Sequence, residues 1–242
     1  PKADHYIFAG TGMLTSMDVS KLQGRKTVLI TDSHYLNKTK TIDEIIKREN
    51  IEVFCMADLW DYCLLDKRMY IHPFIDFKIN IEKAKKLRVC HSPFSNNKMK
   101  LKGSNHISKA LSNLHTKGHI FDYECITGDS WKNTLNRKSK CHFFIDQLCI
   151  ETHPSSKHYK GGIGKSGLEA MLLKCLTFSS GERVNSDTPP PPYVIVNSIE
   201  ELEDQLSDYI NNEKERTHLI NTQYEWALKY TNPTLITQRI TQ

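Results

Sequence analysis

The sequence lacks the patterns of a membrane-spanning, disulfide-bonded or zinc-binding protein. Its 242 residues include no apolar run near the ~18 residues that a membrane-spanning helix needs. None of the 7 cysteines forms a C-x-x-C pair, and several stand in apolar, strand-like runs such as CHFFIDQLC. Such placement is typical of buried, reduced thiols. We therefore expect a cytoplasmic protein with no membrane span, no disulfide framework and no zinc site.

Neither sign of charge is scarce, and the balance leans only slightly to the basic side. Thirty-three Lys and Arg residues against 28 Asp and Glu give a formal net charge of +5. This excess is compatible with an anionic partner but is too small to indicate one by itself. The length is sufficient for one large domain or two modest ones.

Strand-like and helix-like segments alternate along the whole chain. This alternation predicts an α/β fold with mainly parallel sheets. A lysine-rich stretch, 78–86, separates two Rossmann-like series, so we place a short N-terminal domain at 1–85 and a second domain at 86–242. Near the end, Ser198 and Glu201 predict a capping box at the start of an amphipathic helix.

A glycine-rich loop, KHYKGGIGKSGLEAML at 157–172, runs straight into a predicted helix. A nucleotide-hydrolysing P-loop is disfavoured, because its first glycine position is Tyr159 here. Glycines still let backbone amides approach an anion, and the helix start attracts negative charge. The alternative is purely structural: Ser166 and Glu169 fit a capping box.

A second candidate anchor lies upstream, where Lys102-Gly103 precedes another predicted helix and follows the strand LRVCHSPF. Taken alone, such a pair is usually a solvated turn. Both loops, however, follow strands of the same predicted sheet. Ligands of open α/β sheets bind at the carboxyl ends of the strands. Together the two loops favour a site for an anionic ligand.

The order of these motifs resembles the C-terminal domain of retaining glycosyltransferases of the GT-B fold. The resemblance rests on HSP…KGS..IS.AL, CHFFIDQ and GGIGKSGLEAM, followed by closing helices with a tryptophan, and it covers 87 to about 230. It implies an α/β fold of two Rossmann-like domains facing a cleft. It also implies a nucleotide-sugar donor, which we expect to be a UDP-sugar.

The resemblance also implies roles for residues of the two loops. Lys102 would neutralise the donor diphosphate, and Glu169 would accept hydrogen bonds from the ribose hydroxyls. The remaining donor-binding residues would be Gly103, Gly162, Gly164, Lys165, Ser166 and Gly167. Two departures stand out. A glutamate that the family often carries is Gly161 here, and an arginine before the Lys-Gly pair is absent, with Lys98 and Lys100 as possible substitutes.

The acceptor side is expected at strand ends of the first domain. His34 and Asp32 are the catalytic candidates, since a histidine titrates near neutrality and serves as a proton shuttle. A structural role for His34 is an open alternative. The remaining cleft candidates are Gly10, Gly12, Ser33 and, from the second domain, His91.

No metal or other cofactor is expected. The chain has no D-x-D triplet, the pattern of metal-chelating glycosyltransferases. In GT-B enzymes a helix dipole and basic side chains take the metal's role of stabilising the leaving diphosphate.

The acceptor is open. A hydroxymethylated base in double-stranded DNA is one candidate, as in phage DNA-modifying sugar transferases, which would act in the host cytoplasm. Lys98, Lys100 and the lysines of 83–86 would then face the DNA. The alternatives are a glycan or lipid acceptor and a non-catalytic nucleotide-binding module.

Overall fold

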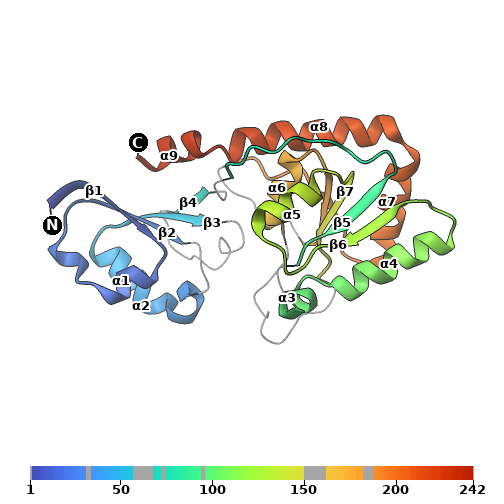
Figure 1. Ribbon diagram of the computed structural model, residues 1–242. Helices are drawn as coiled ribbons and strands as arrows, with labels where there is room; N and C mark the ends of the chain where they lie inside the picture. Colours follow the sequence, from blue (N-terminus) through green and yellow to red (C-terminus); the bar gives the residue numbers. More distant parts are fainter. Residues whose placement is uncertain are drawn as a thin grey trace. The chain divides into compact units, whose positions relative to one another are not determined.

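The computed structural model describes residues 2–30, 34–56, 68–71, 75–93, 96–149, 162–181 and 188–241 (Figure 1). The chain forms two compact units. The first contains 1–73 with 184–190 and 236–242, and the second contains 74–183 with 191–235. Both are α/β units with parallel sheets, as the alternating sequence pattern predicts.

The first unit is built on a four-stranded parallel sheet of order β1-β2-β3-β4. Helices α1 and α2 follow β1 and β2, as expected for parallel strands that need crossover connections. The elements are β1 (Lys2–Ala9), α1 (Gly12–Ser16), the short 3₁₀ helix η1 (Val19–Lys21), β2 (Gln23–Ile30), α2 (His34–Arg48), β3 (Glu52–Met56) and β4 (Arg68–Ile71).

Alternating side chains of this sheet reach two different hydrophobic clusters. Val28 and Ile30 pack with residues of α1 and α2 on one face. Leu29, between them in the sequence, belongs to the opposite face, where it packs with Phe54 and with Ile236 of helix α9 (Pro233–Thr241). The period of two is that of a strand buried on both sides.

The second unit holds a five-stranded parallel sheet of order β6-β5-β7-β8-β9. The strand order reverses between β5 and β7, which makes the carboxyl end of these two strands the switch point where open α/β sheets bind ligands. The elements are β5 (Arg88–His91), α3 (Asn96–Leu101), α4 (Ser104–Thr116), β6 (Asp122–Cys125), α5 (Trp131–Lys138), β7 (Phe143–Gln147), α6 (Lys165–Leu172), β8 (Leu176–Ser179), β9 (Val194–Ile195), α7 (Ile199–Asn211) and α8 (Glu213–Tyr230).

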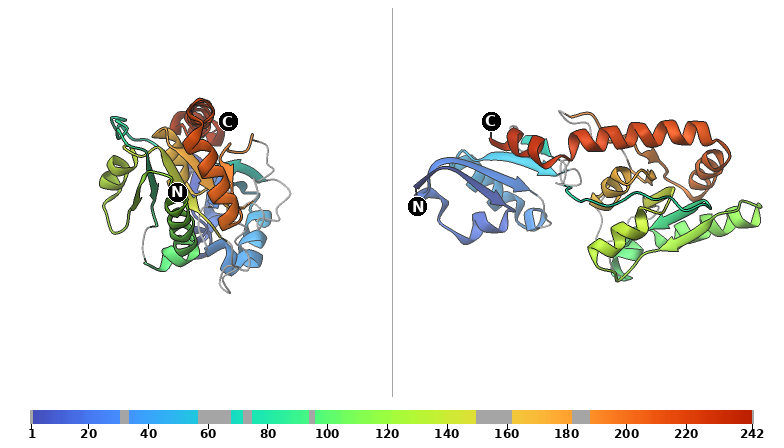
Figure 2. Two further views of the ribbon diagram at one scale, coloured as in Figure 1. Left: turned by 90° about the vertical axis from the view of Figure 1, so that its right-hand side faces the viewer. Right: turned by 45° about the horizontal axis from the view of Figure 1, so that its top comes forward.

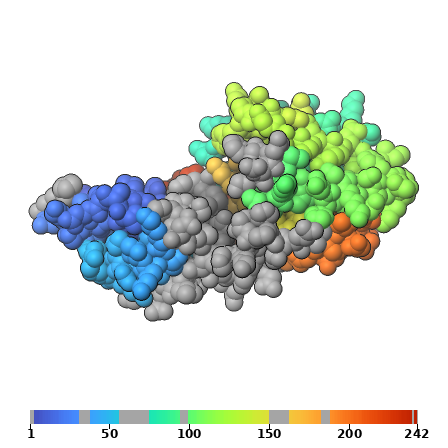
Figure 3. Space-filling view, turned by 90° about the horizontal axis from the view of Figure 1, so that it is seen from below, coloured from blue at the N-terminus to red at the C-terminus, as the bar shows by residue number. Residues whose placement is uncertain are grey.

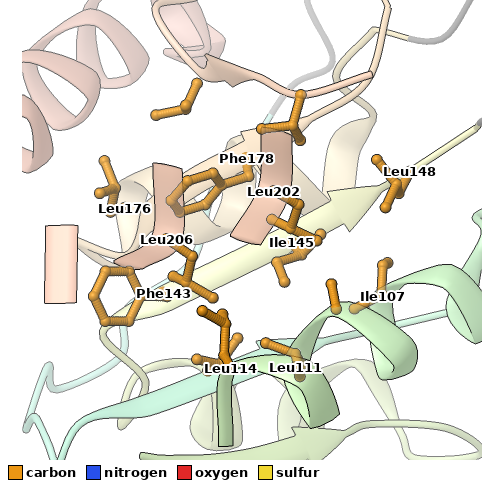
Figure 4. Close-up of a cluster of buried hydrophobic side chains, with 14 of the residues drawn as sticks. Ile107, Leu111, Leu114, Phe143, Ile145, Leu148, Leu176, Phe178, Leu202 and Leu206 are labelled. Carbon is orange, nitrogen blue, oxygen red and sulfur yellow. The ribbon is translucent and has the colours of Figure 1, made fainter. Parts of the chain in front are cut away.

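The central strand β7 has both of its faces buried. Phe143 and Ile145 point into a cluster with α4 and α7, shown in Figure 4, whereas Phe144 packs with α5 and α6 on the other face. The long helix α8 of this unit, visible in Figure 2, contacts α6 and β8. The sheet therefore lies between helical layers, and its strand ends are fixed from both sides.

The unit boundary differs from the one that the sequence predicts. The division falls between Pro73 and Phe74 instead of at 85. Three apolar side chains of 75–84, from Phe77, Ile79 and Ile81, pack against the core of the second unit. Composition identified 78–86 as a lysine-rich stretch between the two series, but its Ile79 and Ile81 are apolar and pack with residues of β5, β7, α5 and α6.

Two further expectations concern helices. Ser198 caps α7, because its side chain accepts a hydrogen bond from the Glu201 amide at 3.0 Å. This confirms the cap, although the Glu201 carboxylate bonds the amide of Asn197 at 2.7 Å and not that of Ser198. Of the helices in the described ranges, none is long and apolar enough to cross a membrane.

Candidate functional site

The two loops that the sequence singles out meet at one carboxylate, that of Asp146 near the end of β7. Its Oδ1 accepts a hydrogen bond from Lys102 Nζ at 2.5 Å. Its Oδ2 accepts one from the backbone amide of Gly164, at the start of α6, at 2.7 Å. Lys102 comes from the connection after β5 and Gly164 from the connection after β7. The contact therefore lies at the switch point of the sheet.

Gly103 presses the Lys102 loop onto the chain that leaves β7. It has φ +68°, and an added Cβ would lie only 1.9 Å from the carbonyl oxygen of Leu148. The amide of Leu148 in turn donates to the carbonyl of Lys102 at 2.9 Å. Glycine is needed here for its conformation and for close approach. It positions Lys102, and its own amide donates to the Lys100 carbonyl at 3.2 Å.

The glycines of the second loop are also tied to the protein. The amide of Gly162 donates to Ser180 at 2.6 Å, and its carbonyl accepts from the side chains of Gln147 and Ser179. A Cβ on Gly167 would lie 2.5 Å from Ile163 Cγ1. In this structure the Gly162 and Gly164 amides both have an acceptor within the protein, so a phosphate would have to take the place of that acceptor. Their role in donor binding stays a prediction.

The remaining donors of this loop are at the first turn of α6. The amides of Lys165 and Ser166 belong to that turn, where no intrahelical acceptor is available. The side chain of Lys165 is exposed, with its Nζ 5.7 Å from the centroid of the Trp131 ring. These groups form the open, positive side of the site.

Glu169 does not form the capping box. The N-cap of α6 is Gly164, and this position makes no side-chain cap hydrogen bond. Instead, Glu169 Oε1 accepts from the indole Nε1 of Trp131 at 2.8 Å and Oε2 accepts from Lys138 Nζ at 3.1 Å. The structure thus rejects the capping box for this residue. It places a buried carboxylate beside an exposed tryptophan.

Lys138 is a site residue that sequence reasoning missed. Its side chain is only 1% exposed. Besides Glu169, its Nζ donates to the hydroxyl of Ser166 at 2.7 Å and to the Ser166 carbonyl at 3.2 Å. In the sequence it is the last basic residue of a short helix, where a lysine usually lies in solvent and complements the helix dipole. No local pattern separates it from such a lysine.

Burial and charge set the ionisation of the site. Burial opposes ionisation of Asp146, but the charge and hydrogen bond of Lys102 and the bond from Gly164 outweigh it and lower the pKa of the carboxyl below its usual value. The site therefore holds a permanent anion inside its basic rim at neutral pH.

His91, expected in the cleft, is fully buried below the site. Its Nδ1 lies 2.8 Å from the carbonyl oxygen of Ile145 and its Nε2 lies 2.8 Å from Ser104 Oγ. Burial lowers its pKa to about 4, so the imidazole is neutral at pH 7. The cleft assignment is wrong, because the ring joins β5, β7 and the start of α4 and has no access to solvent.

The acceptor-side candidates of the first unit follow neighbouring strands. Gly10 is buried after β1, and Gly12 begins α1 with open space where a Cβ would lie. His34 begins α2 after β2, and only its backbone is described. Asp32 and Ser33, like Gly161 of the second loop, lie outside the described residues. The roles of Asp32, Ser33 and His34 stay predictions.

The lysines expected at a DNA surface differ in their surroundings. Lys83 is wrong for that role, since its Nζ donates inward to the carbonyls of Cys141 and Leu173. Lys86 pairs with Asp122 at 2.6 Å. Lys85 and Lys100 are exposed, and the side chain of Lys98 is outside the described part.

Comparison with known proteins gives a fold but no sequence relative: no protein-family profile and no curated protein matches the chain. HepE of Anabaena, solved with UDP-glucose, matches with TM-score 0.63 and 13% identity over 98% of this chain and 77% of its own. Sucrose-phosphate synthase of Thermosynechococcus elongatus matches with 0.61 and 10% identity over 98% and 71%. An α-glucosyltransferase, solved with UDP and a 13-mer DNA containing an HMU base, matches with 0.60 and 11% identity over 99% and 80%.

These identities are too low to show more than the fold. They confirm the predicted class: the chain has the α/β architecture of GT-B glycosyltransferases.

Proposed function

We propose that the protein is a glycosyltransferase that moves a sugar from a UDP-sugar to an acceptor hydroxyl. The observation that carries the proposal is the meeting of Lys102 with the start of α6 at the switch point of a parallel sheet. The fold supports it, because similar structures were solved with UDP-glucose or UDP.

In this proposal the second unit binds the donor through three kinds of group. Lys102 and the exposed Lys165 neutralise the diphosphate, assisted by the first-turn amides of α6. Glu169 accepts hydrogen bonds from the ribose hydroxyls, with Ser166 beside it. The nucleotide sugar is a co-substrate. The cations and the helix start stabilise the leaving diphosphate, so the proposed reaction needs no metal.

The reaction itself is a displacement at the anomeric carbon. The bond between this carbon and the diphosphate oxygen breaks, and a bond to the acceptor oxygen forms. The acceptor proton passes to a base, for which His34 and Asp32 are the proposed candidates. Charge grows on the departing diphosphate, and this is where Lys102 contributes most.

The first experiment tests the donor. Thermal unfolding is measured with a panel of nucleoside diphosphates and nucleotide sugars, because a ligand that binds the folded state raises the melting temperature. We expect stabilisation by UDP and by at least one UDP-sugar. Slow release of free sugar and UDP without an acceptor then shows an enzyme. Binding without any turnover, with or without acceptors, would indicate a non-catalytic nucleotide-binding module instead.

For the acceptor, we propose a hydroxymethylated base in double-stranded DNA. The exposed Lys85 and Lys100 and the +5 charge are compatible with a polyanion, and one protein of similar fold was solved with DNA. Radiolabelled sugar transfer to hydroxymethylated and unmodified duplexes of the same sequence tests this. Label on the hydroxymethylated duplex alone is expected. Label on neither, with an active donor present, would indicate a glycan or lipid acceptor.

A further inference from the structure

Asp146 places an anion inside the site that the proposed function assigns to another anion, the donor diphosphate. Its two oxygens take one hydrogen bond from Lys102 Nζ at 2.5 Å and one from the Gly164 amide at 2.7 Å. A diphosphate bound by Lys102 and the start of α6 would need these same positive groups. The carboxylate thus has the binding partners of a phosphate.

The two members of this pair differ in their freedom to move. The Asp146 side chain is completely buried in β7, whereas that of Lys102 is 20% exposed. The carboxylate is fixed by the sheet, but the Lys102 side chain is partly exposed, and its ammonium group has three donor hydrogens. A ligand can therefore draw on Lys102 without displacing Asp146, and the two anions then share one cation.

We propose that Asp146 is an internal counter-anion that competes with the donor diphosphate for Lys102 and thereby limits its affinity. This inference rests on the proposed donor site. When the sugar has been transferred, the nucleoside diphosphate leaves as Lys102 returns fully to Asp146. The carboxylate keeps Lys102 in place when the site is empty and weakens product binding when it is filled.

The chain offers a matched control in the pair of Lys117 and Glu203. Their atoms are 2.6 Å apart, and the Glu203 side chain is 7% exposed, so this pair also combines a buried carboxylate with a more exposed lysine. It joins α4 to α7, which lie side by side on the surface in Figure 3, and does not involve the strand ends of β5 and β7. Glu203→Gln removes a comparable charge outside the site.

The test is a calorimetric titration of wild type, Asp146→Asn and Glu203→Gln with UDP and with inorganic pyrophosphate. Asparagine keeps the shape of the side chain and an acceptor for the Gly164 amide but removes the charge. We expect Asp146→Asn to bind both anions on the order of tenfold more tightly than wild type, the effect of removing one nearby repulsive charge. Glu203→Gln should bind as wild type does.

The outcomes separate this inference from the proposed function. Equal or weaker binding by Asp146→Asn, with wild type binding UDP, would overturn the competition and leave the donor site standing. If Asp146→Asn bound pyrophosphate but neither protein bound UDP, the competition for Lys102 would stand and the proposed UDP-sugar donor would fail. If neither wild type nor Asp146→Asn bound either anion, both the competition and the donor site would be overturned.

A measurement on the wild type covers the case in which Asp146→Asn does not fold. In a chain with ¹⁵N-labelled lysines, the Lys102 Nζ signal is assigned by its loss in Lys102→Arg. Saturating pyrophosphate should shift this signal, because the ammonium group exchanges part of its contact with Asp146 for the phosphate. A signal that stays in place would overturn the proposal.

Discussion

Two lysine–carboxylate pairs lie in the same site and differ mainly in burial. Lys102 and Asp146 are 2.5 Å apart, with side chains 20% and 0% exposed. Lys138 and Glu169 are 3.1 Å apart, with side chains 1% and 5% exposed. In the first pair the lysine side chain is partly exposed. The second has both ions inside.

The surroundings of the two cations extend this contrast. Lys138 donates to Glu169 and twice to Ser166, so its three hydrogens are used within the protein. Within the part of the chain that the structure describes, Lys102 Nζ donates to Asp146 alone. The same chemistry therefore gives a fixed structural pair in one case and a cation with spare donors in the other. Exposure, and not charge, decides which lysine is available to a ligand.

The largest effect is expected at the buried pair. Lys138→Met leaves the Glu169 carboxylate buried without its cation, which should lower the free energy of unfolding by about 3–5 kcal/mol. Urea denaturation measures it. The matched control is Lys165→Met, which removes an exposed cation of the same site and should change stability by about 0.5 kcal/mol or less. Equal losses in the two variants would contradict the distinction drawn from burial.

At the exposed pair, Lys102→Ala should lower turnover by about 10²-fold or more, as loss of a charge-stabilising donor does. The sequence alone places Lys102 at the edge of a cleft, and from this we would expect the variant to keep its fold. The structure predicts a stability loss as well, because Asp146 is left buried and ionised without its partner.

The double variant separates the two effects. Lys102→Ala with Asp146→Asn removes both charges, so it should regain stability in urea denaturation while donor hydrolysis stays low. Recovery of hydrolysis together with stability would assign Lys102 a structural role only.

His91 extends the comparison of the two ion pairs, because it is a buried titratable group that is neutral at pH 7. The pKa of His91 is about 4 in the folded protein, whereas an unfolded histidine titrates near 6.5. Between these values the unfolded state binds more protons, so His91 alone should lower stability by about 1.4 kcal/mol for each pH unit on acidification from roughly pH 6.5 to 4. Urea titrations at several pH values measure the slope.

His91→Gln is the control for this slope. It keeps hydrogen-bonding groups but cannot take up a proton, so the slope should become shallower. Some slope should remain, because burial also lowers the pKa of His142 to about 4. An unchanged slope would show that His91 does not contribute to the acid sensitivity.

The smallest effect is expected at the indole that covers Glu169. Trp131→Phe keeps the aromatic ring beside Lys165 but removes the hydrogen bond from Nε1 to Glu169 Oε1. A buried hydrogen bond to a charged group contributes roughly 1.5–3 kcal/mol to stability, and the exposure of Trp131 lowers this contribution, so a loss of about 1 kcal/mol is expected. UDP binding should persist, since Lys138 still holds Glu169. A collapse of UDP binding would instead make the indole a direct ligand contact.

The glycine loop, the Lys102 turn and their placement at strand ends could all be predicted from sequence, because each depends on local pattern. The α/β class and the cap at Ser198 were predictable for the same reason. The ion pairs could not be. Asp146 and Lys102 are 44 positions apart, and Glu169 and Lys138 are 31 apart. Only the folded sheet brings these partners together.

Two residues, His91 and Lys83, do not lie where the sequence analysis expected them, and the reason is again the three-dimensional packing. His91 ends a strand, which is where binding residues gather, but the end of β5 is covered by the start of α4 through Ser104. Lys83 lies in a polar stretch, and its aliphatic stem lets the charged end reach carbonyls inside the second unit. Both errors come from treating sequence position as exposure.

The packing of α9 has a consequence for synthesis on the ribosome. Leu29 and Phe54, on one face of the first sheet, are covered by Ile236 and Ile240, which are translated nearly two hundred residues later. At ordinary elongation rates that interval is on the order of ten seconds or more. During this interval the apolar face of the first sheet is exposed to solvent, and chaperones bind surfaces of this kind. The unit that emerges first is thus completed last.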